Sequence, residues 1–86
     1  MLVEYRKEIE NIDLEIAKLF NQRFEVVKKI KGVKEEMKIE IEDKDRETYL
    51  KARVTKEVFT EFEDLFSVFY DKLIELSKEF QQKWCF

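Results

Sequence analysis

The sequence predicts an all-α protein in which three helices per chain form an intertwined helical homodimer. Two features predict the helical class: the 86 residues include one Gly and no Pro, and they are rich in Lys, Glu, Leu and Ile. A third feature, an apolar stripe that continues through residues 2–37, predicts the dimer. A helix of that length cannot bury its apolar face within a chain of this size.

The composition limits the classes of partner. The chain is 43% charged and 44% hydrophobic with eight Phe, so it has enough apolar side chains to pack a core. Its net charge of −3 disfavours nucleic acid, which binds to dense cationic surfaces. No segment approaches the roughly 18 apolar residues that span a bilayer, and the N-terminus lacks the apolar block of a signal peptide. We therefore expect a cytoplasmic protein with no membrane attachment.

The first predicted helix covers residues 2–37. Its apolar stripe recurs in steps of three and four residues and has one charged member among eleven: Leu2, Tyr5, Ile9, Ile12, Ile16, Leu19, Arg23, Val26, Ile30, Val33 and Met37. Gly32 weakens this helix by roughly 1 kcal/mol relative to Ala without ending it. The helix would be about 54 Å long, whereas a compact chain of this size is about 30 Å across. Two copies lying alongside each other would cover the stripe.

The second predicted helix covers about residues 44–56. Residues 38–42 alternate apolar and acidic side chains and are typical of a short extended connector. Asp43 is suited to the N-cap position, and Asp45 and Glu47 lie in the first turn, where the helix dipole favours negative charge. No Gly or Pro marks the end of this helix.

The third predicted helix covers about residues 61–84. Thr60 and Glu63 form a T-x-x-E pattern, which is typical of a capping box at a helix start. The apolar residues that follow keep a helical spacing: Phe62, Leu65, Phe66, Phe69, Tyr70, Leu73, Leu76 and Phe80. No internal repeat or linker is present, so we expect residues 1–86 to form a single domain.

Cationic side chains accompany the apolar stripe of the first helix. Arg23 and Lys34 are 11 residues apart, which places them within about 20° of one face and roughly 16 Å apart along the axis. Because a buried cation is costly without a counter-charge, they could bind a small anion, or Arg23 could form an interhelical salt bridge with one of the 20 acidic residues. Arg6 lies about 26 Å from Arg23 and could complete only a partner's pocket. Taken alone, Arg6 is typical of a solvated surface charge.

Polar residues also accompany the other two predicted helices. Ser77 and Gln81 continue the i, i+4 row through Leu73. Arg46 and Glu47 stand at the start of the second helix, and each of these residues is ordinary by itself. Together, three or four cations, one or two acids and two neutral hydrogen-bonding groups predict a site for a small ligand with two carboxylates and a hydroxyl group.

These residues occur in a specific order along the chain. The pattern comprises Arg6-x-x-Ile9-x-x-Ile12-Asp13, Leu19-x-x-x-Arg23, Lys34, Asp43-x-x-Arg46-Glu47 and Ser77-x-x-x-Gln81. It closely resembles the all-α class of chorismate mutases. The resemblance extends over 75 residues and is far more specific than Asp-x-x-Arg-Glu alone.

The resemblance implies an intertwined dimer of three-helix chains with two equivalent sites. The implied reaction is the intramolecular Claisen rearrangement of chorismate to prephenate, the entry to phenylalanine and tyrosine synthesis. By matched position, Arg23 and Arg46 would bind the substrate carboxylates. Arg6 would reach in from the partner chain, and Ser77 would assist a carboxylate.

The remaining matched residues would act at the ether oxygen and the ring hydroxyl of chorismate. Lys34 and Gln81 would hydrogen-bond the ether oxygen that breaks from the ring, and Glu47, with help around Asp43, would hold the hydroxyl. Catalysis would come from binding the reactive conformer and from placing positive charge at the ether oxygen, where a preorganised donor contributes roughly 3 to 4 kcal/mol. A pericyclic rearrangement needs no nucleophile, and we expect no metal and no cofactor. The lone Cys85 and the absence of His offer neither a disulfide nor a Cys/His metal site.

The sequence departs from the family pattern between the second and third predicted helices. This connection looks shorter than is usual in the family and lacks turn residues, so the two helices could run on and alter the assembly. Because the chain ends soon after Gln81, we expect no fused enzymatic or regulatory domain. Two alternative functions are an isochorismate pyruvate-lyase, which uses a similar cationic pocket, and a non-catalytic helical-bundle interaction module.

Overall fold

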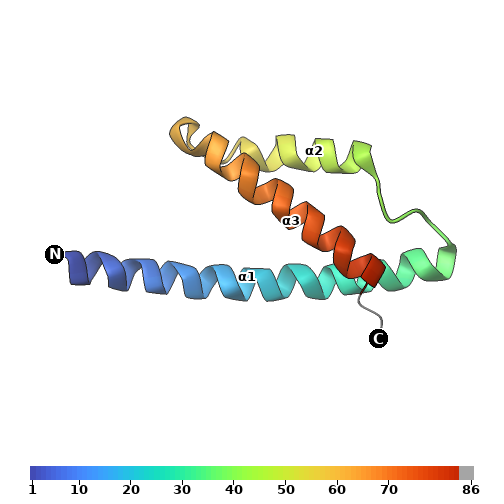
Figure 1. Cartoon of the computed structure of the whole chain (residues 1–86), viewed down its shortest axis with the longest axis horizontal. Helices are drawn as coiled ribbons and strands as arrows, with labels where there is room; N and C mark the ends of the chain where they lie inside the picture. The colour runs from blue at the N-terminus through green and yellow to red at the C-terminus, as the bar shows by residue number, and fades with distance from the viewer. Residues whose placement is uncertain (84–86) are drawn as a thin grey trace.

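The computed structural model describes residues 1–83, and all of their regular structure is helical (Figure 1). The elements are α1 (Leu2–Met37), α2 (Lys44–Thr55), the 3-10 turn η1 (Thr60–Phe62) and α3 (Glu63–Lys83). The prediction of an all-α chain with three helices is confirmed. The predicted end of the third helix at residue 84, and Cys85, lie outside the described residues.

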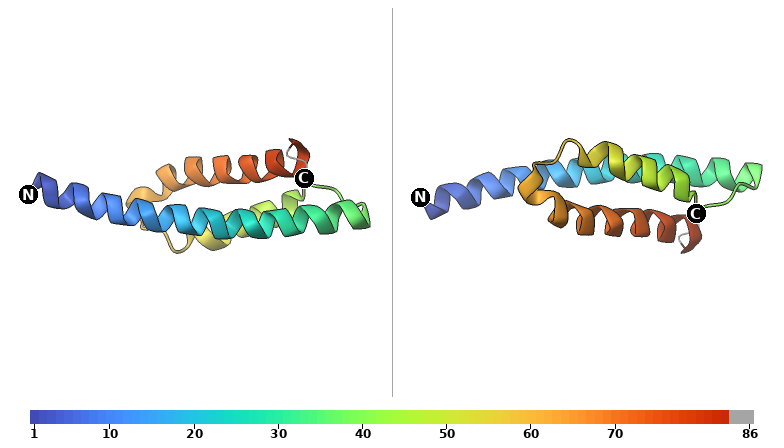
Figure 2. Two further views of the ribbon diagram at one scale, coloured as in Figure 1. Left: turned by 90° about the horizontal axis from the view of Figure 1, so that it is seen from below. Right: turned by 90° about the horizontal axis from the view of Figure 1, so that it is seen from above.

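The helices α2 and α3 form an antiparallel pair that lies across one side of α1 (Figures 1 and 2). α3 approaches both α1 and α2 closely, whereas the backbones of α1 and α2 lie farther apart in the described part of the chain. The N-terminal part of α1 continues past the ends of the other two helices in every view (Figure 2). The chain therefore leaves much of its longest helix uncovered.

The first helix is as long as its apolar stripe predicts, and it dominates the shape of the chain. α1 has 36 residues, and the molecule measures 54 × 29 × 16 Å along its principal axes. The Cα radius of gyration is 15.8 Å, whereas about 12 Å is typical of a compact chain of this length. Gly32 lies inside α1 without breaking it, and nothing lies within 4 Å of the position that a Cβ would take there. Despite its length, neither α1 nor any other described helix is apolar enough to cross a membrane.

α1 ends at a residue in the left-handed backbone conformation. Lys38 has φ 55° and ψ 42°, and the amides of Lys38 and Ile39 donate to carbonyls of the last helical turn. These bonds satisfy carbonyls that a helix end would otherwise leave free. Residues 38–43 then lead to α2, where Oδ1 of Asp43 accepts from the amide of Arg46 at 3.0 Å. The predicted N-cap position of Asp43 is confirmed.

The connection from α2 to α3 turns without Gly or Pro. After α2 ends at Thr55, the amides of residues 57 and 58 donate to carbonyls three residues back, at 3.1 and 3.0 Å. Phe59 is then extended, with φ −62° and ψ 141°. Two short i→i+3 bonds and one extended residue are enough to reverse the chain, so α2 and α3 do not run on as a single helix.

The start of the third helix differs from the prediction. Thr60 does not cap α3: it lies inside η1, and Phe59 occupies the N-cap position of that turn with no side-chain hydrogen bond. The capping box predicted for Thr60 and Glu63 is therefore wrong, because a threonine that already has helical geometry cannot serve as the cap. The amide of Phe62 bonds instead to the carbonyl of Phe59 at 2.9 Å.

The chain buries very little of its apolar surface. Among the described residues, Val27 and Tyr70 are the only buried hydrophobic side chains, each 6% exposed. Between α1 and α3, Phe24 lies edge-on to Phe80 with ring centroids 6.0 Å apart, and it stacks on Phe20 at 4.5 Å. Because so little apolar surface is buried, the hydrophobic effect contributes little to the folding of a single chain.

Candidate active site

Arg23 links the middle of α1 to α3. Its side chain is half-buried, and its Nη1 donates to Oγ of Ser77 at 2.5 Å. Ser77 is 6% exposed and donates in turn to the carbonyl of Leu73 at 2.9 Å. The guanidinium also lies 5.9 Å from the ring centroid of Phe24, within the range of a cation–π contact. These partners are neutral, and Arg23 forms no ion pair with a carboxylate in residues 1–83.

Gln81 lies one turn beyond Ser77 on the same buried face of α3. It is 8% exposed, and its Nε2 donates to the carbonyl of Ser77 at 3.2 Å. Its Oε1 is buried and has no hydrogen-bond partner. An unpartnered buried acceptor costs about 1 to 3 kcal/mol, which a ligand would remove only by donating a hydrogen bond to Oε1.

Lys34 reaches from α1 to the connector between α1 and α2. Its side chain is half-buried, and its Nζ donates to the carbonyl of Ile41 at 2.7 Å. This partner is also neutral, and Lys34 has no carboxylate partner in the described part of the chain. Two half-buried cations without counter-charges favour an anionic ligand.

Burial follows one face of α1 between these two cations. Val27 and Lys31 are buried on that face, each 6% exposed, at spacings of four and eight residues from Arg23. Lys31 forms an ion pair with Glu35, one turn further along α1. The sequence analysis did not identify Lys31, since nothing in its neighbourhood distinguishes it from the surface lysines beside it.

The start of α2 carries three residues that the sequence assigned to the site. Asp43 is exposed, and its side chain caps the helix. Arg46 is exposed, with its guanidinium 5.4 Å from the ring centroid of Tyr49. Glu47 is half-buried and forms a 3.2 Å ion pair with Lys78 of α3. No hydrogen bond or ion pair among the described residues joins this group to the two α1 cations.

Lys78 is a charged residue near this group that the sequence analysis did not identify. Its Nζ lies 3.1 Å from Oε1 of Glu42 in the connector and 3.2 Å from Oε1 of Glu47 in α2. The hydrogen bond to Glu42, followed by the one to Glu47, raises the pKa of Lys78, and Lys78 in turn lowers the pKa of Glu42. Local sequence could not predict this cluster, because the partners of Lys78 are 36 and 31 residues away.

Arg6 is remote from the other predicted site residues of its own chain. It is exposed near the start of α1 and has no hydrogen bond or ion pair in the described residues. Helix geometry separates it from Arg23 by about 26 Å along the axis. Arg6 and Arg23 of one chain therefore do not meet, as the spacing predicts.

An open cavity of about 560 Å³ lies beside Arg23. Apart from Arg23 and Lys72 it is lined by apolar and aromatic side chains, among them Leu19 of α1 and Phe69 of α3. Its lining lacks the other predicted site residues, so it is not by itself a pocket for a doubly charged ligand. It is an apolar hollow that continues the uncovered stripe of α1.

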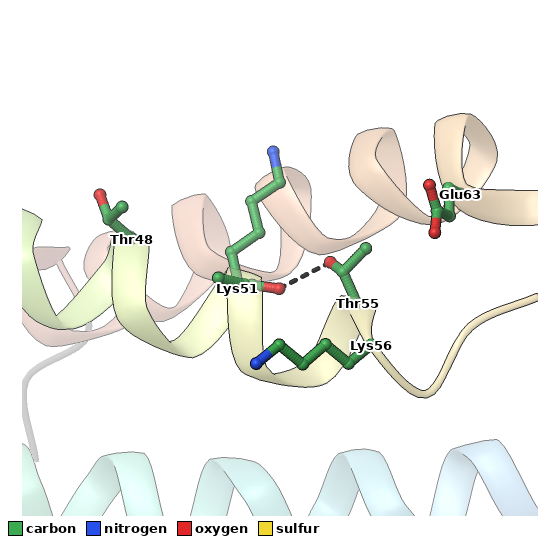
Figure 3. A pocket seen from close by; sticks show the side chains of 6 residues that line it. Thr48, Lys51, Thr55, Lys56 and Glu63 are labelled. Carbon is green, nitrogen blue, oxygen red and sulfur yellow. Dashed lines mark hydrogen bonds between the residues drawn. The ribbon is translucent and has the colours of Figure 1, made fainter. Parts of the chain in front are cut away.

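A second hollow of about 460 Å³ lies between α2 and the start of α3 (Figure 3). Its lining includes Lys51, Thr55 and Glu63, and the Thr55 hydroxyl donates to the Lys51 carbonyl at 2.6 Å (Figure 3). None of the predicted site residues lines this hollow. In residues 1–83, no group of three or more His, Cys, Asp or Glu side chains is placed to hold a metal ion.

Comparison with known proteins covers nearly the whole chain. The family model of chorismate mutase type II matches residues 5–82. A chorismate mutase of Methanocaldococcus jannaschii is 38% identical over 55 residues, which are 64% of this chain and 56% of that protein, so the chain spans only about half the length of that relative. No solved structure gives a significant match. The family resemblance predicted from the ordered site residues is confirmed: the chain belongs to the chorismate mutase type II family.

Proposed function

We propose that this chain is a chorismate mutase, which converts chorismate into prephenate by an intramolecular Claisen rearrangement. The observation that carries the proposal is the pair of half-buried α1 cations, Arg23 and Lys34, whose hydrogen-bond partners are neutral. A substrate with two carboxylates would supply the missing negative charge. Membership of the family supports chorismate as that substrate.

Arginines would bind the two carboxylates of the substrate. Arg23 is held by Ser77 in a half-buried position, from which its planar guanidinium can form a bidentate pair with a carboxylate. Ser77 would assist the same carboxylate through its hydroxyl. Arg46 would bind the other carboxylate from the start of α2, which requires it to leave its stacked position on Tyr49.

Lys34 and Gln81 would stabilise the transition state at the ether oxygen. As the C–O bond of the ether breaks and the new C–C bond forms, negative charge grows on that oxygen. Lys34 would exchange the carbonyl of Ile41 for this oxygen. Nε2 of Gln81 uses one of its two N–H groups on Ser77, so the second can donate to the ether oxygen.

Glu47 would accept a hydrogen bond from the ring hydroxyl of chorismate. Its carboxylate is half-buried at the first turn of α2, and one oxygen is already fixed by Lys78. Asp43 would support this role indirectly, because its side chain caps α2 and so fixes the turn that carries Glu47.

We also propose that two chains form an intertwined homodimer and that Arg6 completes the partner's site. The apolar stripe of α1 supports this: Ile9 is 57% exposed and Leu19 is 60% exposed in a single chain. The apolar cavity beside Arg23 would be filled by the partner's helix. In an antiparallel pair, the start of one α1 approaches the middle of the other, which would bring Arg6 to the partner's site.

A single assay tests the proposed activity. The purified chain is incubated with chorismate, the loss of chorismate absorbance is followed, and the product is identified chromatographically. We expect prephenate at a rate far above the spontaneous rearrangement. Folded protein that leaves that rate unchanged would contradict the proposal.

The same experiment separates the alternatives. Release of salicylate and pyruvate from isochorismate, with no turnover of chorismate, would identify an isochorismate pyruvate-lyase. A folded, associating chain with neither activity would support a non-catalytic interaction module.

A further inference from the structure

Lys78 joins three parts of the chain at one ammonium group. It projects from α3, and its Nζ lies within 3.2 Å of both Glu42 of the connector and Glu47 of α2. The side chains of Lys78 and Glu47 are only 28% and 26% exposed, whereas Glu42 is 49% exposed. The cluster includes Glu47, one of the proposed substrate contacts, and Lys78 directly follows Ser77 in α3, about 100° further round the helix.

The connector is held from both sides by lysines. Lys34 of α1 donates to the carbonyl of Ile41 at 2.7 Å, and Lys78 of α3 pairs with Glu42, the next residue. Without substrate, these two bonds fix the short segment that leads into α2; when Lys34 moves to the ether oxygen, the pair of Lys78 and Glu42 remains. The orientation of the first turn of α2, and of Glu47 on it, therefore depends on Lys78 in two ways: directly and through the connector.

Only one of the two carboxylate oxygens of Glu47 has a partner in the described residues. Lys78 binds Oε1, and Oε2 of Glu47 has no partner among the described residues. A Glu side chain with neither oxygen fixed samples several rotamers, whereas one with Oε1 fixed presents Oε2 in a restricted set of directions. Oε2 is the oxygen that would accept from a substrate hydroxyl.

Residues 40–47 also carry an excess of negative charge, which would repel a doubly negative substrate. Residues 40–47 contain two basic side chains, Lys44 and Arg46, against five acidic ones: Glu40, Glu42, Asp43, Asp45 and Glu47. Lys78 is a cation from another helix that two of these acids share. It lowers the repulsion that the segment exerts on an approaching dianion.

We propose that Lys78 is a positioning residue of the mutase site: it fixes the Glu47 carboxylate so that Oε2 accepts the substrate hydroxyl, and it offsets the negative charge of residues 40–47. This inference rests on the proposed function. Lys78 does not touch the reacting atoms and acts through Glu47. Its loss therefore weakens substrate binding more than the chemical step.

The test measures kcat and KM for chorismate in the full chain. Lys78→Gln is expected to raise KM about tenfold with a smaller change in kcat, because the hydroxyl contact is made in both the ground state and the transition state. A purely structural role would reduce the amount of active enzyme, which lowers the apparent kcat and leaves KM unchanged. Lys78→Arg, which keeps the charge, is expected to keep KM within about threefold of the wild-type value.

The chain offers a matched control. Lys51 of α2 forms a 2.7 Å ion pair with Asp71 of α3, joining the same two helices as Lys78 and Glu47, and its side chain is 34% exposed. Lys51→Gln therefore removes a comparable interhelical pair outside the proposed site, and KM is expected to stay within about twofold of wild type. Each variant removes partly exposed ion pairs of one lysine and keeps a polar side chain there, so both are expected to fold, which thermal melting verifies.

Two further variants show whether Lys78 acts through Glu47. In a Glu47→Gln background, adding Lys78→Gln is expected to raise KM by much less than tenfold, because only the offset of the segment's negative charge is then lost. Glu42→Gln leaves Lys78 wholly to Glu47 and is expected to raise KM by less than Lys78→Gln does, because only the connector contact is lost. A rise with Glu42→Gln as large as with Lys78→Gln would assign the effect to the connector and overturn the proposal.

The remaining outcomes separate this inference from the proposed function. If wild type turns over chorismate and Glu47→Gln impairs it, but Lys78→Gln leaves KM within about twofold, the inference alone fails. An equal cost of Lys78→Gln with and without Glu47 also overturns it alone. Wild-type chain that does not turn over chorismate refutes the proposed function, and the inference with it.

Discussion

Arg23 and Lys34 carry charges that the described part of their chain does not neutralise with carboxylates. Arg23 is held by Ser77 and Lys34 by the carbonyl of Ile41, both of which are neutral. The interhelical salt bridge that could have given Arg23 a purely structural role is not formed among the described residues. These two cations therefore favour a negatively charged ligand.

Removing either cation tests whether Arg23 and Lys34 bind an anionic substrate. Arg23→Ala and Lys34→Ala are each expected to lower kcat/KM by about two to three orders of magnitude, since a preorganised charged donor contributes roughly 3 to 4 kcal/mol to the transition state. The helix content measured by circular dichroism should stay the same. Arg53→Ala, which removes an exposed arginine paired with Glu57 at 3.6 Å, serves as the control and should keep the wild-type rate. Unchanged rates for Arg23→Ala and Lys34→Ala would favour the non-catalytic module.

Gln81 should determine the pH dependence of the reaction. Its amide donates without first taking up a proton, so wild-type activity is expected to be flat across neutral pH. Gln81→Glu donates only in the protonated form, and burial raises the pKa of a carboxyl group. Its activity should therefore be highest at acidic pH and fall as the pH rises through that pKa.

The neighbouring residue provides the control for this change. Gln82 is exposed, so Gln82→Glu adds the same charge without entering the buried face of α3. Its pH–rate profile should match that of wild type. A flat profile for Gln81→Glu as well would show that Gln81 does not donate to the substrate.

At the scale of elements, the helices were predictable because their signals are local. The three-and-four spacing predicts α1 to the residue, and Asp43 predicts the start of α2. The capping box predicted at Thr60 and Glu63 was wrong because the same residues also fit a 3-10 turn, which the T-x-x-E spacing does not exclude. Lys78 was missed because its partners lie on other elements.

The C-terminal end of α1 offers a stability prediction. Lys38 is a non-glycine residue at φ 55°, a conformation that costs an L-residue about 1 kcal/mol or more. Lys38→Gly is expected to raise the free energy of unfolding by up to about 1 kcal/mol in urea titrations. Lys29→Gly, inside α1 and exposed, should lower it by about the same amount. A loss of stability with Lys38→Gly would mean that the lysine side chain itself holds the connector.

At the scale of the whole molecule, a single chain is an incomplete structure. Within the described residues it buries two hydrophobic side chains, and the apolar stripe of α1 stays exposed. An obligate dimer has no separate monomer stability, so its unfolding should depend on protein concentration. The dimer and the cytoplasmic location remain predictions from the sequence, because both concern surroundings that one chain does not contain. The single domain also remains a prediction.

A substitution on the stripe tests association. Ile9 is 57% exposed in one chain, so Ile9→Glu would cost little in a monomer but would bury a charge in a dimer. Sedimentation equilibrium is expected to show a dimer for wild type and dissociated chains for Ile9→Glu. Glu8→Gln, at the adjacent position outside the stripe, should stay dimeric. An Ile9→Glu chain that still forms the wild-type dimer would place the interface elsewhere.

The most direct test of the shared site mixes two inactive variants. Arg6→Ala and Arg23→Ala chains are each expected to be strongly impaired, and after subunit exchange one site of every heterodimer carries both arginines. With random exchange, the mixture should recover about one quarter of the wild-type specific activity. No recovery after exchange has been verified with tagged chains would contradict the claim that two chains build each site.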